Sequence, residues 1–282
     1  MGNQDQNPLS HYFRAPKLYV KLPSNGAYYE EGFIEYPVTE SEVAVMPMTG
    51  KDEMILKNPD ALLNGEAIIS MIKSCCPTIS DPRKLLTNDI EVLTLAIRYA
   101  TYENDNSIDM DCPKCNHSNH YKFNIEELLE RVELLESEYI VNLSNGATVV
   151  VQPYNFELTM KMTMSTLDEQ RIVSALETAD ISDEVRMSKF SQSYLNLAQL
   201  NFDTVFKSVI KVIAGDTIVE DRNQIREFIN NISAKDVEKI EEKLGEINKI
   251  GIPQTFKAVC SECKHEWNAP VEFNPVNFFT DS

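Results

Sequence analysis

The 282-residue sequence is poor in several residue types that particular functions require. It has only 9 glycines and 4 histidines, and it contains no G-x-G-x-x-G, P-loop, G-x-S-x-G or H-E-x-x-H motif. Phosphate-cradling loops need closely spaced glycines, and a hydrolytic triad needs a positioned histidine base. Nothing marks a catalytic pair among the many carboxylates. We therefore expect that the protein is not an enzyme and has no small-molecule substrate.

Basic residues are also scarce, because Lys and Arg number 26 against 44 Asp and Glu, which gives a net charge of −18. Nucleic acids and anionic membranes are bound through clustered Lys and Arg, so both are disfavoured as partners. No stretch approaches the roughly 18 consecutive apolar residues of a membrane-spanning helix. The segment 1–10 lacks the apolar core of a signal peptide. We expect assembly in a reducing cytoplasm and binding to neutral or basic protein partners.

Six cysteines are too few for a disulfide scaffold in a chain of this size, but four of them form two C-x-x-C motifs. Two thiolates two residues apart on a tight turn can bind one metal ion from the same side. A second such pair completes the tetrahedron of a structural zinc site. We predict one structural zinc ion per chain, bound by Cys112, Cys115, Cys260 and Cys263.

The sequence around each motif is typical of a zinc ribbon. Segments 107–112 and 121–123 flank the first motif as strands, and segments 255–260 and 270–273 flank the second. A histidine also follows the first cysteine of each motif by five residues, at His117 and His265. Zinc with four thiolate ligands has no open position for water or substrate, so the predicted site is structural.

Two other interpretations of the cysteines stay open. A thioredoxin-like redox pair would place its C-x-x-C motif at the start of a helix, and neither motif opens an obvious helix. Two separate sites could instead combine each cysteine pair with His117, His120 or His265. Cys75 and Cys76 precede Pro77 at the end of an apolar stretch, and we expect them to be buried, inert thiols.

The chain also shows signs of an internal duplication. Ser-Asn-Gly interrupts apolar-rich strands at Asn25-Gly26 and again at Asn145-Gly146, and Asn-Gly is a strong hairpin signal. We predict an α+β fold of two duplicated halves, each a β-hairpin plus helices that end in a C-x-x-C motif. The halves meet at the zinc site, and the second half is mainly helical. The predicted divisions are a flexible tail over 1–14, a first half over 15–137 and a second half over 138–282.

Apolar periodicity predicts eight helices, over 60–74, 89–103, 125–137, 157–179, 187–199, 203–214, 222–232 and 234–250. Asn88 with Glu91, and Ser233 with Asp236, resemble capping boxes. The helix at 125–137 carries an acidic face that we expect to be exposed to solvent, with a partner surface as the alternative.

The order of these parts resembles the baseplate hub and hub-assembly proteins of T-even-type bacteriophages, which have contractile tails. The resemblance runs from about residue 15 to the end of the chain. It rests on Leu-Pro-Ser-Asn-Gly at 22–26, Asn-Asp-Ile-Glu-Val-Leu at 88–93, both C-x-x-C motifs with their histidines, and Asn-Pro-Val-Asn-Phe-Phe at 274–279. The helical region around 165–230 is longer than in shorter members of that family.

This resemblance implies a non-enzymatic protein of the virion tail baseplate, assembled in the host cytoplasm. Its partners would be other tail proteins, and a homo-oligomer in a symmetric assembly is compatible with it. A transient tail-assembly chaperone that is absent from the virion is not separable from this function by sequence. A zinc-ribbon module for nucleic acid or transcription is the other alternative, although acidic residues flank both motifs.

Overall fold

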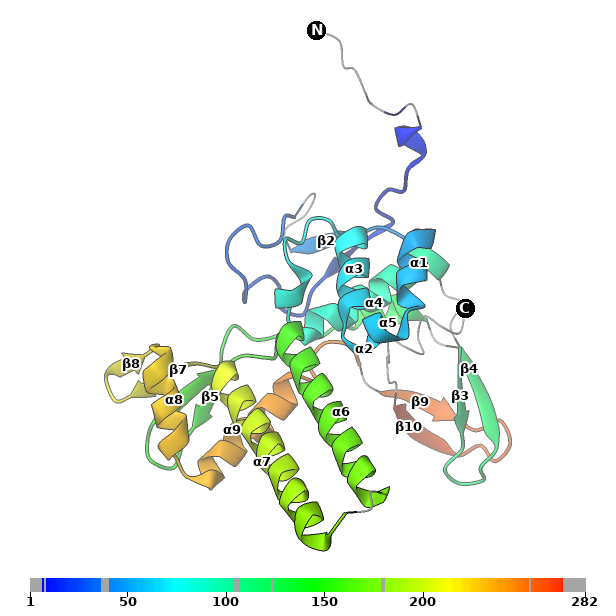
Figure 1. Cartoon of the computed structure of the whole chain (residues 1–282). Helices are drawn as coiled ribbons and strands as arrows, with labels where there is room; N and C mark the ends of the chain where they lie inside the picture. Colours follow the sequence, from blue (N-terminus) through cyan, green and yellow to red (C-terminus); the bar gives the residue numbers. More distant parts are fainter. Residues whose placement is uncertain are drawn as a thin grey trace.

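The computed structural model describes residues 7, 9–36, 41–103, 107–122, 124–178, 181–253 and 255–270. Within these residues the fold is α+β, as predicted, with nine α-helices and small antiparallel sheets (Figure 1). None of the described helices is long and apolar enough to cross a membrane. The predicted Phe-Phe ending at 278–279 and the first six residues of the predicted tail lie outside the described residues.

The first part of the chain is a helical layer beside a two-stranded sheet. Strand β1 (Leu18–Lys21) pairs antiparallel with β2 (Glu42–Val45). The helical elements are α1 (Gly50–Leu56), α2 (Pro59–Leu63), α3 (Glu66–Cys75), η2 (Pro82–Lys84) and α4 (Thr87–Tyr102), and a short turn η1 (Ser10–Tyr12) precedes β1. Helix α4 is buried over most of its length, and Leu93, Leu95 and Ile97 are fully buried in the core.

The predicted helix over 60–74 is two helices, because the chain turns at Gly65. Gly65 has a φ of 79°, a left-handed conformation that glycine adopts without a steric cost. A Cβ atom at this position would lie within 3 Å of Met160 and Phe156 in a later helix. The glycine therefore allows both the turn and the close approach of that helix.

The second part of the chain is built on a four-stranded antiparallel sheet in the order β5-β6-β7-β8. The strands are β5 (Tyr139–Asn142), β6 (Thr148–Val151), β7 (Val209–Ala214) and β8 (Thr217–Val219). The predicted Asn145-Gly146 hairpin joins β5 to β6. The remaining helices are α6 (Phe156–Thr178), α7 (Asp183–Ser208), α8 (Arg222–Asn231) and α9 (Ala234–Ile247). Apolar side chains of the sheet, α8, α9 and the end of α7 form a second core.

The helix predicted over 203–214 is wrong in its second half. One helix, α7, covers both 187–199 and 203–208, and the chain then continues as strand β7. The run Val209, Ile210, Val212 and Ile213 is β-branched, which suits a strand. Pairing with β6 satisfies the backbone of this run, so tertiary contact decides its structure. The helix predicted over 125–137 is also too long, because α5 ends at Glu130 (Ile125–Glu130).

The first predicted hairpin is wrong as well. Asn25 and Gly26 adopt the expected positive φ values of 47° and 77°, but the strand before them pairs with β2 instead of a strand directly after them. The reason lies in Asp89, whose carboxylate accepts the backbone N–H of Ser24 and the hydroxyl of Tyr29. These bonds hold the segment after β1 against α4 as a series of turns.

The predicted capping box at Asn88, next to Asp89, is also wrong. Helix α4 begins two residues earlier than predicted, at Thr87, and Leu86 is its N-cap without a side-chain hydrogen bond. Asn88 is instead buried, and its side-chain amide donates to the carbonyl groups of Ile247 and Ile250 at the end of α9. By contrast, the predicted cap Ser233 does accept the N–H of Asp236 at the start of α9.

Residues 85–89 therefore join the two cores of the molecule, and we call them the junction. Thr87 donates to the carbonyl of Tyr154, and Leu85 accepts from the N–H of Phe156. Gly251 lies beside Asn88, and its carbonyl accepts the N–H of Glu133. Segments from both predicted halves thus meet at one place, so Phe156 enters the first core and Leu86 enters the second.

Burial raises the pKa of Asp89 from about 3.8 to about 6, although the hydrogen bonds from Ser24 and Tyr29 favour its charged form. An acid with a raised pKa in the folded state lowers stability as the pH rises from the unfolded pKa through the folded pKa. We expect the free energy of unfolding of the native protein to fall by about 3 kcal/mol relative to that of Asp89→Asn between pH ~4 and ~7.

The measurement is urea unfolding of the native chain and of Asp89→Asn across this pH range. Asp216→Asn, at an exposed turn between β7 and β8, is the matched control, and its difference from the native protein should stay constant. A difference for Asp89→Asn that does not change with pH would contradict the prediction.

Candidate metal centre

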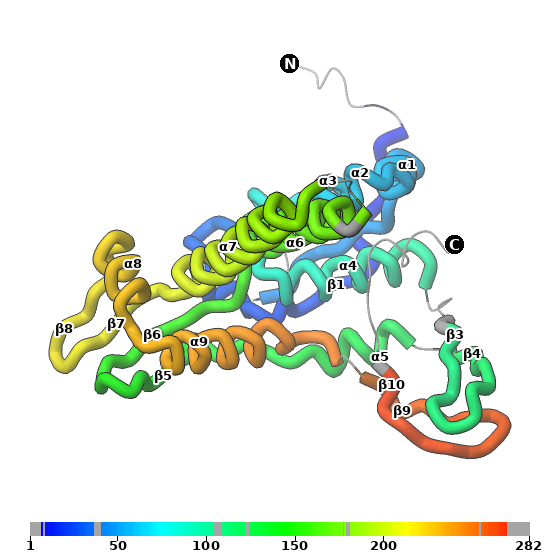
Figure 2. The backbone as a smooth tube through the Cα atoms, turned by 60° about the horizontal axis from the view of Figure 1, so that its bottom comes forward, coloured from blue at the N-terminus to red at the C-terminus, as the bar shows by residue number. Residues whose placement is uncertain are grey.

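Two β-hairpins that are far apart in the sequence lie side by side at one end of the molecule (Figures 1 and 2). The first consists of β3 (Ser107–Asp111) and β4 (Ser118–Lys122), and the second of β9 (Thr255–Val259) and β10 (Glu266–Pro270). Each hairpin carries one C-x-x-C motif in its turn, as the sequence predicts for a zinc ribbon. The strand predicted over 270–273 begins earlier, at Glu266, and residues 271–273 lie outside the described residues.

The two turns have the same local geometry. In the first, the N–H of Cys112 donates to the carbonyl of His117, and the N–H of Asn116 donates back to Cys112. In the second, Cys260 and His265 make the same bond, and Lys264 takes the place of Asn116. Asn116 and Lys264 share a positive φ, 55° and 57°. Each turn therefore aims two sulfur atoms to the same side.

The hairpins bring the four predicted sulfur ligands together. The Sγ atoms of Cys112, Cys115, Cys260 and Cys263 all lie within 4.8 Å of one another. The closest pairs join different hairpins, Cys112 to Cys263 at 3.7 Å and Cys115 to Cys260 at 3.6 Å. These distances are too long for a disulfide bond. They match the roughly 3.8 Å between ligands of a tetrahedral site with metal–sulfur bonds of about 2.3 Å.

The protonation of this cluster depends on its hydrogen bonds. Burial opposes the charged form of Cys260, but the backbone N–H groups of Cys263 and Glu262 and the neighbouring thiols lower its pKa to about 6. The N–H of His117 favours the thiolate of Cys115, but burial and the other three sulfur atoms raise its pKa to about 12. Four thiolates this close together require a bound cation, and metal binding would release the remaining protons.

The histidines near the motifs lie outside the sulfur cluster. The ring of His120 contacts the carboxylate of Asp109 at 2.7 Å, and His117 is exposed. The ring of His265 stacks on Trp267, with 5.9 Å between the centroids. In the described part of the chain, the group that could hold a metal contains cysteines alone. The arrangement therefore favours one shared site over two separate Cys–His sites.

The positions of the C-x-x-C motifs do not fit a thioredoxin-like redox pair. Both C-x-x-C motifs lie in β-hairpin turns, so neither has the helix N-terminus that lowers the thiol pKa in thioredoxin-like proteins.

Cys75 and Cys76 are fully buried, as predicted, and burial raises the pKa of the Cys75 thiol to about 11. The guanidinium of Arg14 lies 3.6 Å from the Cys75 sulfur.

Asn119 is a residue of the site that the sequence analysis missed. It is buried in the first hairpin, and its Oδ1 accepts both the N–H and the hydroxyl of Ser261 in the second. Its Nδ2 donates to the carbonyl of His117 and lies 3.7 Å from the sulfur of Cys260. The side chain thus ties one ribbon to the other beside the sulfur atoms. No sequence pattern marks it, because all its cross-hairpin partners are about 140 residues away.

Aromatic side chains extend the contact between the ribbons. The ring of Tyr121 packs edge-on against Phe256 and against Trp267, with centroids 5.5 and 6.0 Å apart. The hydroxyl of Tyr121 donates to the carbonyl of Val259. Trp267 is the only tryptophan of the chain, so its fluorescence reports on this contact.

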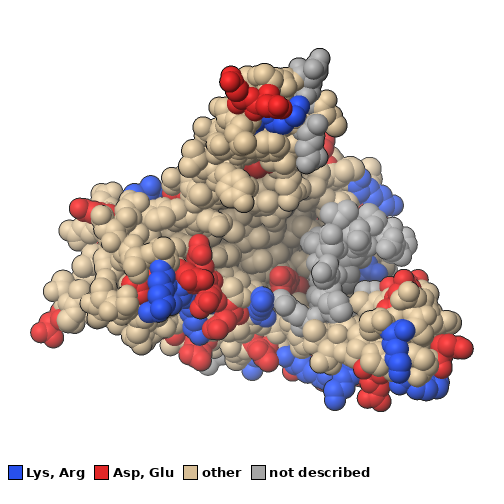
Figure 3. Space-filling model, turned by 90° about the horizontal axis from the view of Figure 1, so that it is seen from below, with Lys and Arg blue, Asp and Glu red and all other residues tan. Residues whose placement is uncertain are grey.

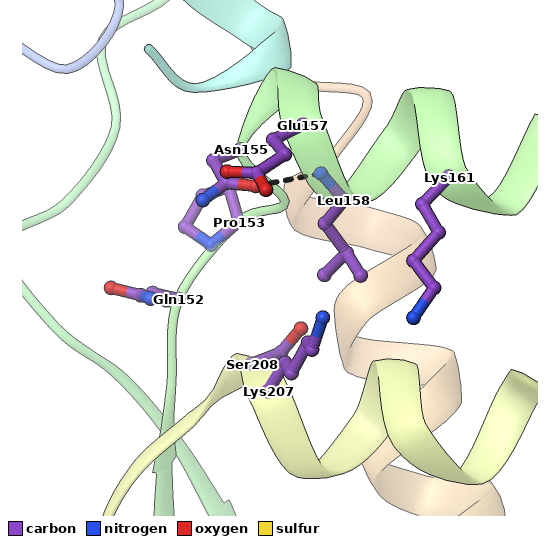
Figure 4. Close-up of a pocket in the computed structure, with 8 residues that line it drawn as sticks. All are labelled: Gln152, Pro153, Asn155, Glu157, Leu158, Lys161, Lys207 and Ser208. Atoms are coloured by element: carbon purple, nitrogen blue, oxygen red, sulfur yellow. Dashed lines mark hydrogen bonds between the residues drawn. The ribbon is translucent and has the colours of Figure 1, made fainter. Parts of the chain in front are cut away.

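A pocket of about 310 Å³ lies at the base of the α6–α7 hairpin, away from the cysteines (Figure 4). Lys161 comes from α6, and Lys207 and Ser208 come from α7. Asn155 also lines the pocket, and its Oδ1 accepts the N–H of Leu158. The pocket could hold a small anion, but its described lining contains neither a histidine nor a cysteine for nucleophilic chemistry.

A helical body joined to a closed four-cysteine site is typical of a structural protein. A family model described as T4 bacteriophage base plate protein matches residues 16–280. The chain therefore belongs to this family, which confirms the resemblance to T4-type baseplate proteins. Membership implies a place in the virion tail and other tail proteins as partners. Comparison with curated proteins and with solved structures gave no match.

We expect Asn119→Ala to lower the free energy of unfolding by about 1–3 kcal/mol, because it leaves Ser261 and the His117 carbonyl without a buried partner. His120→Ala on the same strand is the control, since its exposed contact with Asp109 contributes less than about 1 kcal/mol. Urea unfolding followed by Trp267 fluorescence measures both. Equal effects of the two variants would contradict the bridging role of Asn119.

Proposed function

We propose that this protein is a structural component of the baseplate hub region, in which a zinc ion fixes the two ribbons and helix surfaces dock other tail proteins. The observation that carries the proposal is the pairing of sulfur atoms across the hairpins, Cys112 with Cys263 and Cys115 with Cys260. One ion at their centre would link positions about 150 residues apart. Such a link limits relative movement of the chain segments that lead into the ribbons.

Zinc is the metal that best suits this donor set. Four thiolates in a tetrahedron form a closed structural zinc site, with no open position for substrate. The site would hold the ribbons in place rather than carry out chemistry. The predicted division into two halves at 137/138 stays part of this proposal. The two ribbon turns share one geometry, whereas the hairpin predicted for the first half does not form.

The charge distribution supports a protein partner over a nucleic acid. On the face shown in Figure 3, Lys and Arg side chains are interspersed with Asp and Glu. At the ribbons, Lys114 and Lys257 are accompanied by Asp109, Glu262 and Glu266. A zinc ribbon that binds nucleic acid needs clustered basic side chains to contact phosphates.

We expect the purified chain to contain one zinc ion per molecule, which elemental analysis with protein quantification measures. Removal of the ion by a chelator should change Trp267 fluorescence, because the ribbons separate. Cys75→Ala removes a thiol that does not belong to the cluster and should retain one ion. No zinc, or two ions per chain, would overturn the shared site.

The shared site also predicts strong coupling between the two motifs. Cys112→Ser and Cys260→Ser should lower the free energy of unfolding about equally, and the double variant should lower it little further. Either single change already removes a ligand of the same ion. Additive effects in urea unfolding would instead indicate independent sites.

The location in the virion can be tested in phage particles. Mass spectrometry of purified virions should detect the chain together with the tail proteins, and phage that carry Cys112→Ser should yield fewer complete tails. A chain that is needed for tail assembly but absent from purified particles would identify a transient assembly chaperone.

A further inference from the structure

The pocket at the base of the α6–α7 hairpin is formed by segments that hydrogen bonds hold together. The N–H of Gln152, just after β6, donates to the carbonyl of Ser208 at the end of α7. Asn155, which precedes α6, forms a β-bridge with Leu86 in the junction, and its Oδ1 accepts the N–H of Leu158. The walls of the pocket are therefore fixed before any ligand binds, as is usual for sites that bind small molecules.

Two of the three charged side chains in the described lining of this pocket are lysines from different helices. Lys161 extends from α6 and Lys207 from α7, and both ammonium groups lie in the space between these helices (Figure 4). The third charged residue is Glu157. The lining is thus positively charged on balance, although the whole chain has a net charge of −18.

The ammonium groups of both lysines are available to a ligand. Glu157 precedes Lys161 by four residues, which is the favourable order and spacing for an ion pair within a helix. The ion pair that the described part of α6 forms is instead between Arg171 and Asp168. Within the described residues, Lys161 and Lys207 make neither an ion pair nor a hydrogen bond. Two like charges beside one pocket repel each other, so an anion between them is stabilised by both.

The lysines, and not the start of α6, are the groups that would bind an anion here. The N–H groups of Phe156, Leu158 and Thr159 in the first turn of α6 already have acceptors within the chain. Lysine commonly binds phosphate as a point charge, whereas planar carboxylates are better matched by the fork of an arginine. The volume of about 310 Å³ also suits a small ligand that carries a phosphate group.

We propose that this pocket is a phosphate-binding site, in which Lys161 and Lys207 bind the phosphate group of inorganic phosphate or of a small phosphate ester. The tetrahedral oxygen atoms accept hydrogen bonds from two sides at once, so both ammonium groups donate to the same group. The bound anion links α6 to α7 at the base of their hairpin. Because it binds only the folded chain, it stabilises the attachment of the hairpin to the body.

The test uses the full-length, metal-loaded chain in equilibrium dialysis against radiolabelled inorganic phosphate at constant ionic strength. We expect one saturable site per chain. Lys161→Ala and Lys207→Ala should each raise the dissociation constant about 10-fold, since each removes one charge-assisted hydrogen bond. Glu157→Gln should lower the constant, because it removes the negative charge from the lining. Lys189→Ala removes the same charge about 27 Å away along α7 and should leave the constant unchanged.

Competition identifies the source of the phosphate group. Glycerol phosphate that displaces the label at a lower concentration than unlabelled inorganic phosphate identifies an ester as the ligand, and the reverse order identifies inorganic phosphate. Circular dichroism and Trp267 fluorescence show that each variant is folded before its binding is compared.

The absence of a saturable site, or equal weakening by Lys189→Ala and Lys161→Ala, would overturn the proposal. Zinc content and incorporation into virions test the proposed function separately, so neither depends on this result.

Discussion

The buried polar pair Asn88 and Asp89 holds together the parts on which the rest of the molecule depends. Asp89 fixes the segment after β1, and Asn88 fixes the end of α9, so both apolar cores meet at the start of α4. Gly251, which leads into the second ribbon, lies against Asn88 and is hydrogen-bonded to Glu133, which follows the first. Both ribbons are therefore attached at the same place. A buried carboxyl group is costly without partners, and the surrounding hydrogen bonds offset that cost.

From this junction, the arrangement of the cysteines follows. Two hairpins with a common point of attachment lie side by side, so their turns can place four sulfur atoms within 4.8 Å. Asn119 and Tyr121 then join the ribbons directly, which adds to the positioning of the thiols. The proposed metal would act on an arrangement that hydrogen bonds and aromatic contacts already favour. A link of this kind would keep the ribbons from separating.

The predictions from sequence patterns were correct where contacts between residues close in the sequence decide the local structure. The C-x-x-C motifs, the Asn145-Gly146 hairpin and most helices follow from spacing and turn chemistry within about 20 residues. They were wrong where a contact with a residue far along the chain is stronger than the local preference. Asn25-Gly26 forms the predicted turn but not the predicted hairpin, because the Asp89 carboxylate accepts the backbone N–H of Ser24 and holds this segment against α4. The β-branched residues after Ser208 form a strand because their backbone pairs with that of β6.

The amino-acid sequence by itself determined the acidic net charge and the four candidate ligands, since each is a property of composition or local spacing, and its motifs carried the resemblance to the family. Only the tertiary structure decided which sulfur atoms lie next to each other, that Asn119 links the ribbons, and that Lys161 and Lys207 line the same pocket. These features depend on contacts between residues far apart in the chain. Local periodicity shows that a face is apolar, but the packing of the whole molecule decides what covers it.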